Sequence, residues 1–177
     1  PGNTAYSLWR GYFGFDDLPQ VVNPQSGFIQ NCNSTPFLAS IGADNPDGSY
    51  YPQNLGIELF QTNRALRAHE TFGADESITR EEFYKYKFDT KYSEKSVMGI
   101  NLKRFLDEAS NEDPDVVTAL ELLQNWDLDT DSTSTATHLA ISAIRPHFNP
   151  NNYTYDYAKI MGRLEKIVKE TIENFGK

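Results

Sequence analysis

The sequence predicts an α+β fold that is predominantly helical, with an irregular aromatic lead followed by a cluster of five or six helices. Residues 1–56 hold most of the glycines and prolines and many aromatic side chains, yet show little helical periodicity, which is typical of loops and short strands. From about Thr62 onward, apolar residues recur at helical spacing behind recognisable cap residues. We therefore expect a loop and strand segment over residues 1–56 and a helical region over residues 57–177.

The lead is organised around residues 23–36. A turn at 23–27 feeds a strand-like run at 28–32, which Ser34 and Pro36 then stop. Side chains alternate along an extended chain, so Asn31 and Asn33 share one face while Gln30 lies on the other. Asparagine is depleted in strands, so the pair indicates either side chains that cap loop backbone groups or a polar site at a strand end.

The helical region can be divided by its cap residues. Thr62 can cap a helix over 63–72 with Gly73 after its end, and Thr79 with Glu82 forms a capping box. Ser93 is the expected start of the next helix. After it, an N-cap followed by proline at the first helical position, Asp113 and Pro114, marks another start.

The last helices follow a polar bend over 127–135. One helix is expected to stop at Pro146, and the final one carries the clearest apolar stripe, ending at Gly176. The stripe is typical of core packing, and its members are Tyr157, Ile160, Met161, Leu164, Ile167, Val168, Thr171, Ile172 and Phe175.

Composition excludes several function classes. The net charge is −9 with no basic run, which argues against nucleic acid and anionic membranes as partners, and no segment is long and apolar enough to be inserted in a bilayer. Cys32 is the single cysteine and the three histidines are far apart, so a zinc site is not expected. Because the aromatic lead has few regular elements of its own, we expect it to pack against a neighbouring part.

The order of several short motifs resembles part of the β subunit of the penicillin acylases, which are N-terminal-nucleophile amidohydrolases. The family includes acyl-homoserine lactone and lipopeptide acylases. The motifs that carry the resemblance are Pro1-Gly2-Asn3-Thr4, Leu8-Trp9-Arg10-Gly11, Asn23-Pro24-Gln25-Ser26-Gly27-Phe28-Ile29, Asn31-Cys32-Asn33 with Pro36, Thr62-Asn63-Arg64-Ala65-Leu66-Arg67-Ala68 and Trp126-Asp127. The resemblance implies that the chain is an interior fragment of an αββα fold.

The resemblance also implies site residues. The position that matches the oxyanion-hole asparagine of the family is Asn33, with Asn31 supporting it on the same face. An arginine that hydrogen-bonds toward the active site matches Arg64 or Arg67, although two such arginines on a helix are also typical of a solvated face. No cofactor is implied for catalysis. Some relatives hold a structural calcium ion, for which Asp44 is the candidate ligand, and ordinary turn chemistry is the alternative for that residue.

The family nucleophile is a β-subunit N-terminal Ser, Thr or Cys, whereas this sequence begins with Pro1. The expected partners are therefore the remainder of the acylase α and β subunits and a small N-acyl substrate. The resemblance implies a periplasmic or secreted location. Two alternatives remain open: a non-catalytic helical module that binds a partner through its aromatic lead, and a catalytically dead relative.

Overall fold

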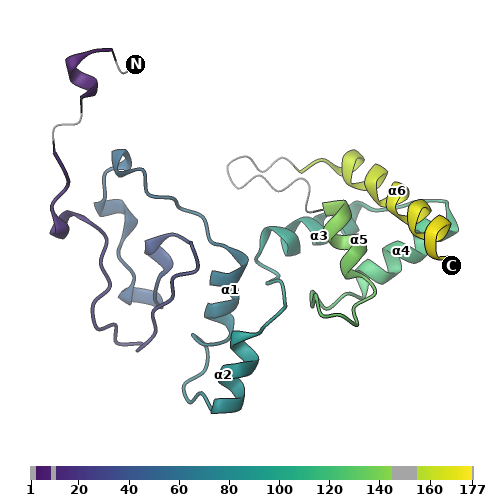
Figure 1. Ribbon diagram of the computed structural model, residues 1–177, viewed down its shortest axis with the longest axis horizontal. Coiled ribbons are helices and arrows are strands. Elements are labelled where there is room, and N and C mark those ends of the chain that lie inside the picture. Colours follow the sequence, from purple (N-terminus) through teal and green to yellow (C-terminus); the bar gives the residue numbers. More distant parts are fainter. Residues whose placement is uncertain (1–2, 9–10, 145–154, 177) are drawn as a thin grey trace. The chain divides into compact units, whose positions relative to one another are not determined.

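The computed structural model describes residues 3–8, 11–144 and 155–176 (Figure 1). The chain divides into two compact units, residues 1–59 and 60–177. Within the described residues all six α-helices belong to the second unit, which confirms the predominantly helical prediction. No helix among these residues has the length and apolar character needed to cross a membrane.

The first unit consists of loops and short turns of 3-10 helix. These turns are Ala5–Ser7, Phe15–Asp17, Pro36–Leu38, Gly42–Asp44, Gly48–Tyr50 and Gln53–Leu55. The strand expected at residues 28–32 was wrong: the only backbone–backbone hydrogen bond that the described structure gives this run joins the Gln30 N–H to the Ala39 carbonyl, at 2.8 Å. A strand needs a row of such partners, and the chain turns away at Pro36 before a second row can form.

The alternation predicted for this run is nevertheless present. Gly27, Ile29, Asn31 and Asn33 are exposed, whereas Gln30 is buried and its neighbours Phe28 and Cys32 are partly buried. The run is therefore extended and two-faced without being part of a sheet, and the two asparagines share its outer face.

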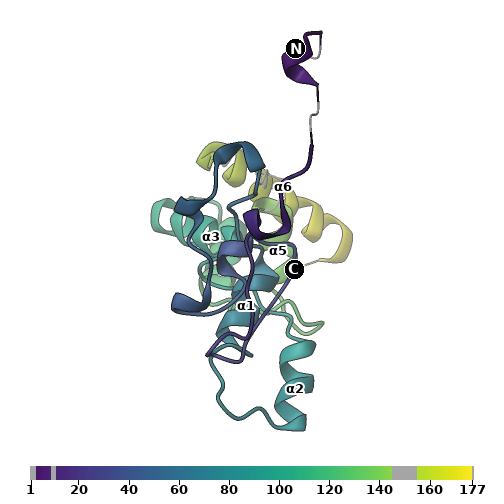
Figure 2. The same ribbon diagram turned by 90° about the vertical axis from the view of Figure 1, so that its left-hand side faces the viewer.

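The second unit contains α1 (Asn63–Glu70), α2 (Arg80–Lys87), α3 (Val97–Glu108), α4 (Pro114–Gln124), α5 (Thr137–Ile144) and α6 (Tyr157–Phe175). Helices α3, α5 and α6 lie together in both views (Figure 1, Figure 2). Helices α3, α4, α5 and α6 share one apolar core, and the predicted apolar stripe of α6 faces that core. The buried members of this core are Met98, Leu102, Phe105, Val116, Ala119, Leu123, Leu139, Ala140, Ala143, Ile144, Ile160, Met161, Leu164 and Val168.

Most predicted helix ends are confirmed. The Thr62 side chain accepts the Ala65 N–H at the start of α1, and Thr79 and Glu82 form a reciprocal capping box at α2. The Asp113 carboxylate accepts the Asp115 N–H, with Pro114 as the first residue of α4. Gly176 follows α6 with φ of 81°, a backbone conformation that glycine adopts without strain.

Two helix ends differ from the prediction. Helix α3 begins after Ser96, whose hydroxyl accepts the Gly99 N–H, and not after Ser93, which is buried and donates to the Glu70 carboxylate at 2.6 Å. Helix α1 ends at Glu70 instead of residue 72, although the Gly73 N–H still bonds the Ala68 carbonyl. The end of α5 expected at Pro146 lies outside the described residues.

Candidate functional site

The Asn31–Asn33 pair forms a tight turn on the surface of the first unit. The Asn33 N–H donates to Asn31 Oδ1 at 3.2 Å, and the Asn33 backbone is left-handed, with φ of 55°. Asparagine tolerates this conformation better than most residues with a side chain. The structure therefore brings the two predicted residues together, with Asn31 fixing the backbone from which the exposed Asn33 carboxamide projects.

The segment that carries this turn is anchored on its inner face by Ser40, which is fully buried. Its hydroxyl donates to the Phe28 carbonyl at 2.7 Å and lies 3.1 Å from the Ser26 hydroxyl. Asn45 binds both backbone groups of Ser40, accepting its N–H at 2.7 Å and donating to its carbonyl at 2.9 Å. These contacts tie residues 26–28 to residues 40–45, and no short sequence pattern identified Ser40 or Asn45 as their centre.

Gln30 makes a second attachment on the inner face. Its Nε2 donates to the Leu38 carbonyl at 2.9 Å and to Ser34 Oγ at 3.1 Å. With the backbone bond to Ala39, these contacts fix the chain immediately before Asn31. The Gln30 Oε1 atom is buried with no hydrogen-bond partner in the described structure, and the residue lines a cavity of about 260 Å³ together with Asn31.

Asp44 stabilises the turn at the start of the segment. Its carboxylate accepts the Ser26 N–H at 2.8 Å and the Gln25 N–H at 3.1 Å. The hydrogen bonds from Ser26 and then Gln25 hold the pKa of Asp44 below its ordinary value. The nearby Asp47 caps another turn through the Ser49 N–H, which likewise lowers its pKa. Both acids therefore have ordinary turn roles.

The described residues do not fit a calcium site by themselves. Both Asp44 oxygens already accept backbone N–H bonds, and no three His, Cys, Asp or Glu side chains gather as metal ligands anywhere in the described parts of the chain. Calcium takes six to eight oxygen ligands. An ion at Asp44 would need the rest of its ligands from elsewhere, so its role as a calcium ligand stays a prediction.

The two candidate arginines have different surroundings on α1. Arg67 forms a bidentate pair with Asp89, through Nε and Nη2 at 2.8 Å each, and its Nη1 is 2.7 Å from Glu70. The Arg67 guanidinium therefore links α1 to the segment that follows α2. Arg64 is exposed and lines a cavity of about 440 Å³. Arg64 is therefore the better candidate for a site role, while Arg67 is structural.

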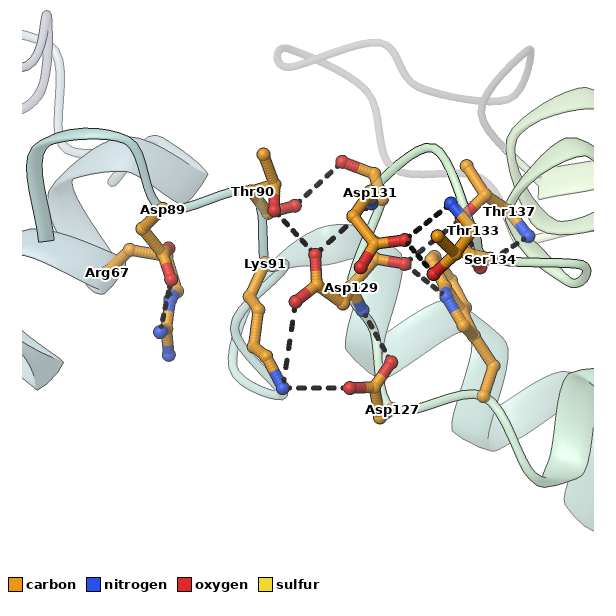
Figure 3. A network of polar contacts seen from close by, with 12 residues as sticks. Arg67, Asp89, Thr90, Lys91, Asp127, Asp129, Asp131, Thr133, Ser134 and Thr137 are labelled. Carbon is orange, nitrogen blue, oxygen red and sulfur yellow. Dashed lines mark hydrogen bonds and ion pairs between the residues drawn. The ribbon is translucent and has the colours of Figure 1, made fainter. Parts of the chain in front are cut away.

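A separate polar network joins residues 90 and 91 to the bend at 127–137 (Figure 3). Lys91 Nζ lies 2.9 Å from Asp127 Oδ2 and 4.0 Å from Asp129 Oδ2, and the bond to Asp127 raises the pKa of Lys91. Lys91 and Asp129 also form an isolated antiparallel bridge. The sequence indicated a polar bend here but not its partner, because the two segments are far apart along the chain.

The carboxylates of the acidic bend already have partners within the described structure. Asp131 accepts hydrogen bonds from the N–H and the hydroxyl of Thr133, which lower the pKa of its carboxyl. The Lys91 ammonium occupies the space between Asp127 and Asp129 that a cation would need. We conclude that this network holds two loops together.

A comparison with protein-family models gives one match that covers most of the chain. The model is described as penicillin amidase, and it matches residues 1–174, which include both asparagines, Asp44 and both arginines.

Proposed function

Since the chain belongs to the penicillin amidase family, whose members are acylase-type amide hydrolases, we propose that it forms part of an acylase that cleaves the amide bond of N-acyl compounds. The substrate classes proposed are penicillin-like amides, acyl-homoserine lactones and lipopeptide side chains. The nucleophile is an N-terminal Ser, Thr or Cys outside these residues, and Asn33 supplies one donor of the oxyanion hole. The observation that carries this proposal is an exposed carboxamide on a turn whose backbone is fixed on both sides.

The chemistry explains why a carboxamide suits this position. When the nucleophile attacks the amide carbonyl, negative charge develops on its oxygen, and N–H donors aimed at that oxygen lower the barrier. An asparagine amide stays neutral at any working pH, so its donors are always present. One such donor is typically worth roughly 2.7–4 kcal/mol of transition-state stabilisation.

Preorganisation is the contribution of the surrounding residues. Asn31 accepts the Asn33 N–H, and Gln30 and Ser40 fix the chain on the inner face of the same segment. A donor held in place before the reaction needs no reorganisation when charge develops. We assign Asn31 as a positioning residue on this ground, and we assign the second-unit arginine role to Arg64 because Arg67 is already engaged by Asp89 and Glu70.

The remaining parts of the proposal concern partners and location. Tyr6, Tyr12 and Tyr50 are 92%, 90% and 83% exposed in the described structure, which supports a contact between the first unit and the remainder of the acylase α and β subunits. We propose a periplasmic or secreted location, as for the acylases that the sequence resembles. Detection of the parent protein by fractionation of the producing cells tests this directly.

The catalytic assignment is tested by Asn33→Ala in the enzyme that carries both this chain and the nucleophile. We expect kcat to fall about a hundredfold or more with little change in KM, because the donor acts mainly in the transition state. The matched control is Asn54→Ala, an exposed asparagine in the Gln53–Leu55 turn of the same unit, which should keep normal kcat. Normal kcat in Asn33→Ala would remove Asn33 from the mechanism, provided that both variants melt like the wild type.

A further inference from the structure

Helix α2 carries an exposed aromatic face. The helix lies apart from α3–α6 in both views (Figure 1, Figure 2), and none of its residues is buried or belongs to their shared core in the described structure. Tyr84 and Phe88 are 48% and 66% exposed. Their rings stack on each other, with centroids 6.3 Å apart and planes 11° apart. An exposed apolar patch with a polar rim is typical of a contact surface.

The opposite side of α2 attaches the helix to its own chain. The Tyr86 hydroxyl donates to Asp75 at 2.7 Å, and the Glu82 carboxylate accepts the Thr79 N–H at 2.8 Å. Glu82 and Tyr86 each lie two residues from Tyr84, which is about half a helical turn. The aromatic face at Tyr84 is therefore directed away from the contacts that hold α2 in place.

The two flanks of this face carry different side chains. On an α-helix, a step of four residues turns slightly more than one full turn, and a step of three turns slightly less. Glu81 and Phe88 therefore lie on one flank of Tyr84, and Arg80 and Lys87 lie on the other. One flank thus offers an anion and an aromatic ring, and the other offers two cations.

The charged groups of the face are accessible to a partner. Arg80 and Glu81 are exposed, and neither forms an ion pair with another described residue. Arg80 Cζ lies 6.0 Å from the centroid of the Tyr84 ring, and Lys87 Nζ lies 5.4 Å from that of Phe88. Both cations are therefore already close to aromatic rings, with which a cation interacts favourably.

We propose that the aromatic face of α2 pairs with the same face of a second copy of this chain, about a two-fold axis parallel to the helix. In a two-fold contact, the same surface of both copies takes part. Parallel helices bring the unlike flanks together at the same level. Glu81 then faces the partner's Arg80, Phe88 faces the partner's Lys87, and the two Tyr84 rings meet at the centre. This contact goes beyond the hydrolytic role of Asn33, since α2 belongs to the second unit.

The flanks also select the direction of pairing. An antiparallel arrangement would bring like flanks together, with Arg80 facing the partner's Lys87 and Glu81 facing the partner's Phe88. The first of these contacts is repulsive, and the second pairs an anion with the negative face of an aromatic ring. Charge complementarity therefore favours the parallel arrangement and disfavours its alternative.

The expected association is weak. Helix α2 has eight residues, so the contact is smaller than a standard protein interface. We expect a reversible dimer with a Kd of roughly 10–100 µM. Sedimentation equilibrium of the 177-residue chain over a range of concentrations measures this Kd directly.

Two charge reversals and their mixture test the pairing. Glu81→Lys and Arg80→Glu should each raise Kd about tenfold or more, because two-fold symmetry places like charges at two equivalent contacts. An equimolar mixture of the two variants should dimerise with a Kd within about threefold of the wild-type value, because the mixed dimer restores both ion pairs. The matched control is Lys103→Glu, which changes the net charge as Arg80→Glu does but lies on α3, and it should change Kd less than about twofold.

Three results would overturn the proposal. A wild-type chain that stays monomeric up to about 1 mM would leave the face to another partner, such as the remainder of the acylase. A mixture of the two folded variants that does not associate would exclude the contact between Glu81 and the partner's Arg80, with helical circular dichroism as the check on folding. Tighter association of Arg80→Glu alone would indicate antiparallel pairing. Sedimentation involves no turnover, so its outcome is independent of the kinetic test of Asn33.

Discussion

Replacing Asn45 with alanine would remove the side chain that joins the two arms of the Asn33-bearing loop. The change deletes three hydrogen bonds: Asn45 Oδ1 with the Ser40 N–H at 2.7 Å, and Nδ2 with the carbonyls of Ser40 at 2.9 Å and Gly42 at 3.3 Å. Ser40 is fully buried, so its N–H would be left without water as a substitute.

The magnitude follows from these bonds. The two short bonds contribute about 1 kcal/mol each, and the buried N–H left unpaired adds to the loss, so we expect about 2–3 kcal/mol less free energy of local opening. Because each 1.4 kcal/mol is a factor of ten, amide hydrogen exchange in the loop should accelerate about 30- to 150-fold.

The Gln30 amide is the best reporter of this opening. It donates to the Ala39 carbonyl, a bond that the substitution does not touch, so its exchange follows the loop and not the deleted contact. Two-dimensional NMR with deuterium exchange measures it residue by residue. Asn54→Ala should leave the Gln30 exchange rate unchanged. An acceleration below about threefold in Asn45→Ala would refute the view that Asn45 holds this loop.

Three further perturbations have defined outcomes. Arg67→Met should lower the free energy of unfolding in urea by about 1–2 kcal/mol, less than for a fully buried pair, because the Arg67 and Asp89 side chains are 20% and 17% exposed. The Tyr86 hydroxyl donates a hydrogen bond to Asp75, which raises the pKa of Tyr86 from 10.0 to about 12. The stabilisation of the fold by this hydrogen bond is therefore complete below pH 10 and is lost as pH rises through 12. Tyr86→Phe should remove this loss of stability at alkaline pH from unfolding curves. Because the pKa of Asp44 is lowered, its ionised carboxylate stabilises the turn above pH 3.8, and this stabilisation is lost as pH falls through the lowered pKa. The loss should be visible as an acid transition in the amide NMR shifts of the turn and should be absent in Asp44→Asn.

Each of these has a matched comparison. Lys103→Met breaks an exposed pair on α3 and should cost less than about 0.5 kcal/mol, so an equal loss in Arg67→Met would contradict the structural role of Arg67. Tyr84→Phe should keep the alkaline step, and its loss there would show that Tyr86 is not the group responsible. Asp47→Asn should keep the acid step in the turn held by Asp44; its disappearance would assign the step to Asp47.

The sequence predicted those parts of the fold that depend on neighbouring residues. The caps at Thr62, Thr79 and Asp113 lie within three residues of the groups they bind, so pattern alone locates them. Ser93 and Ser96 are both suitable caps, and the choice between them depends on Glu70, which is 23 residues away from Ser93. Local pattern does not contain that information.

The same limit applies to the candidate site. The alternation at residues 28–33 and the pairing of Asn31 with Asn33 follow from short spacing, whereas the buried frame of Ser40 and Asn45 comes from residues that close a loop. The assignment of Arg67 to structure required its contact with Asp89, 22 residues later. Sequence alone favoured Arg64 over Arg67 only slightly, and the ion pairs of Arg67 with Asp89 and Glu70 add a structural role for Arg67.

The left-handed backbone at Asn33 restricts which residues position 33 can accept. Glycine adopts a φ of 55° without strain but has no amide, glutamine has the amide but tolerates that φ poorly, and aspartate fits the backbone but would repel an oxyanion. Asn31 is less restricted, because any short side chain with an acceptor oxygen can receive the Asn33 N–H. The left-handed backbone and the proposed oxyanion role therefore select the same residue at position 33 for separate reasons, and we expect substitution there to be tolerated far less than at position 31.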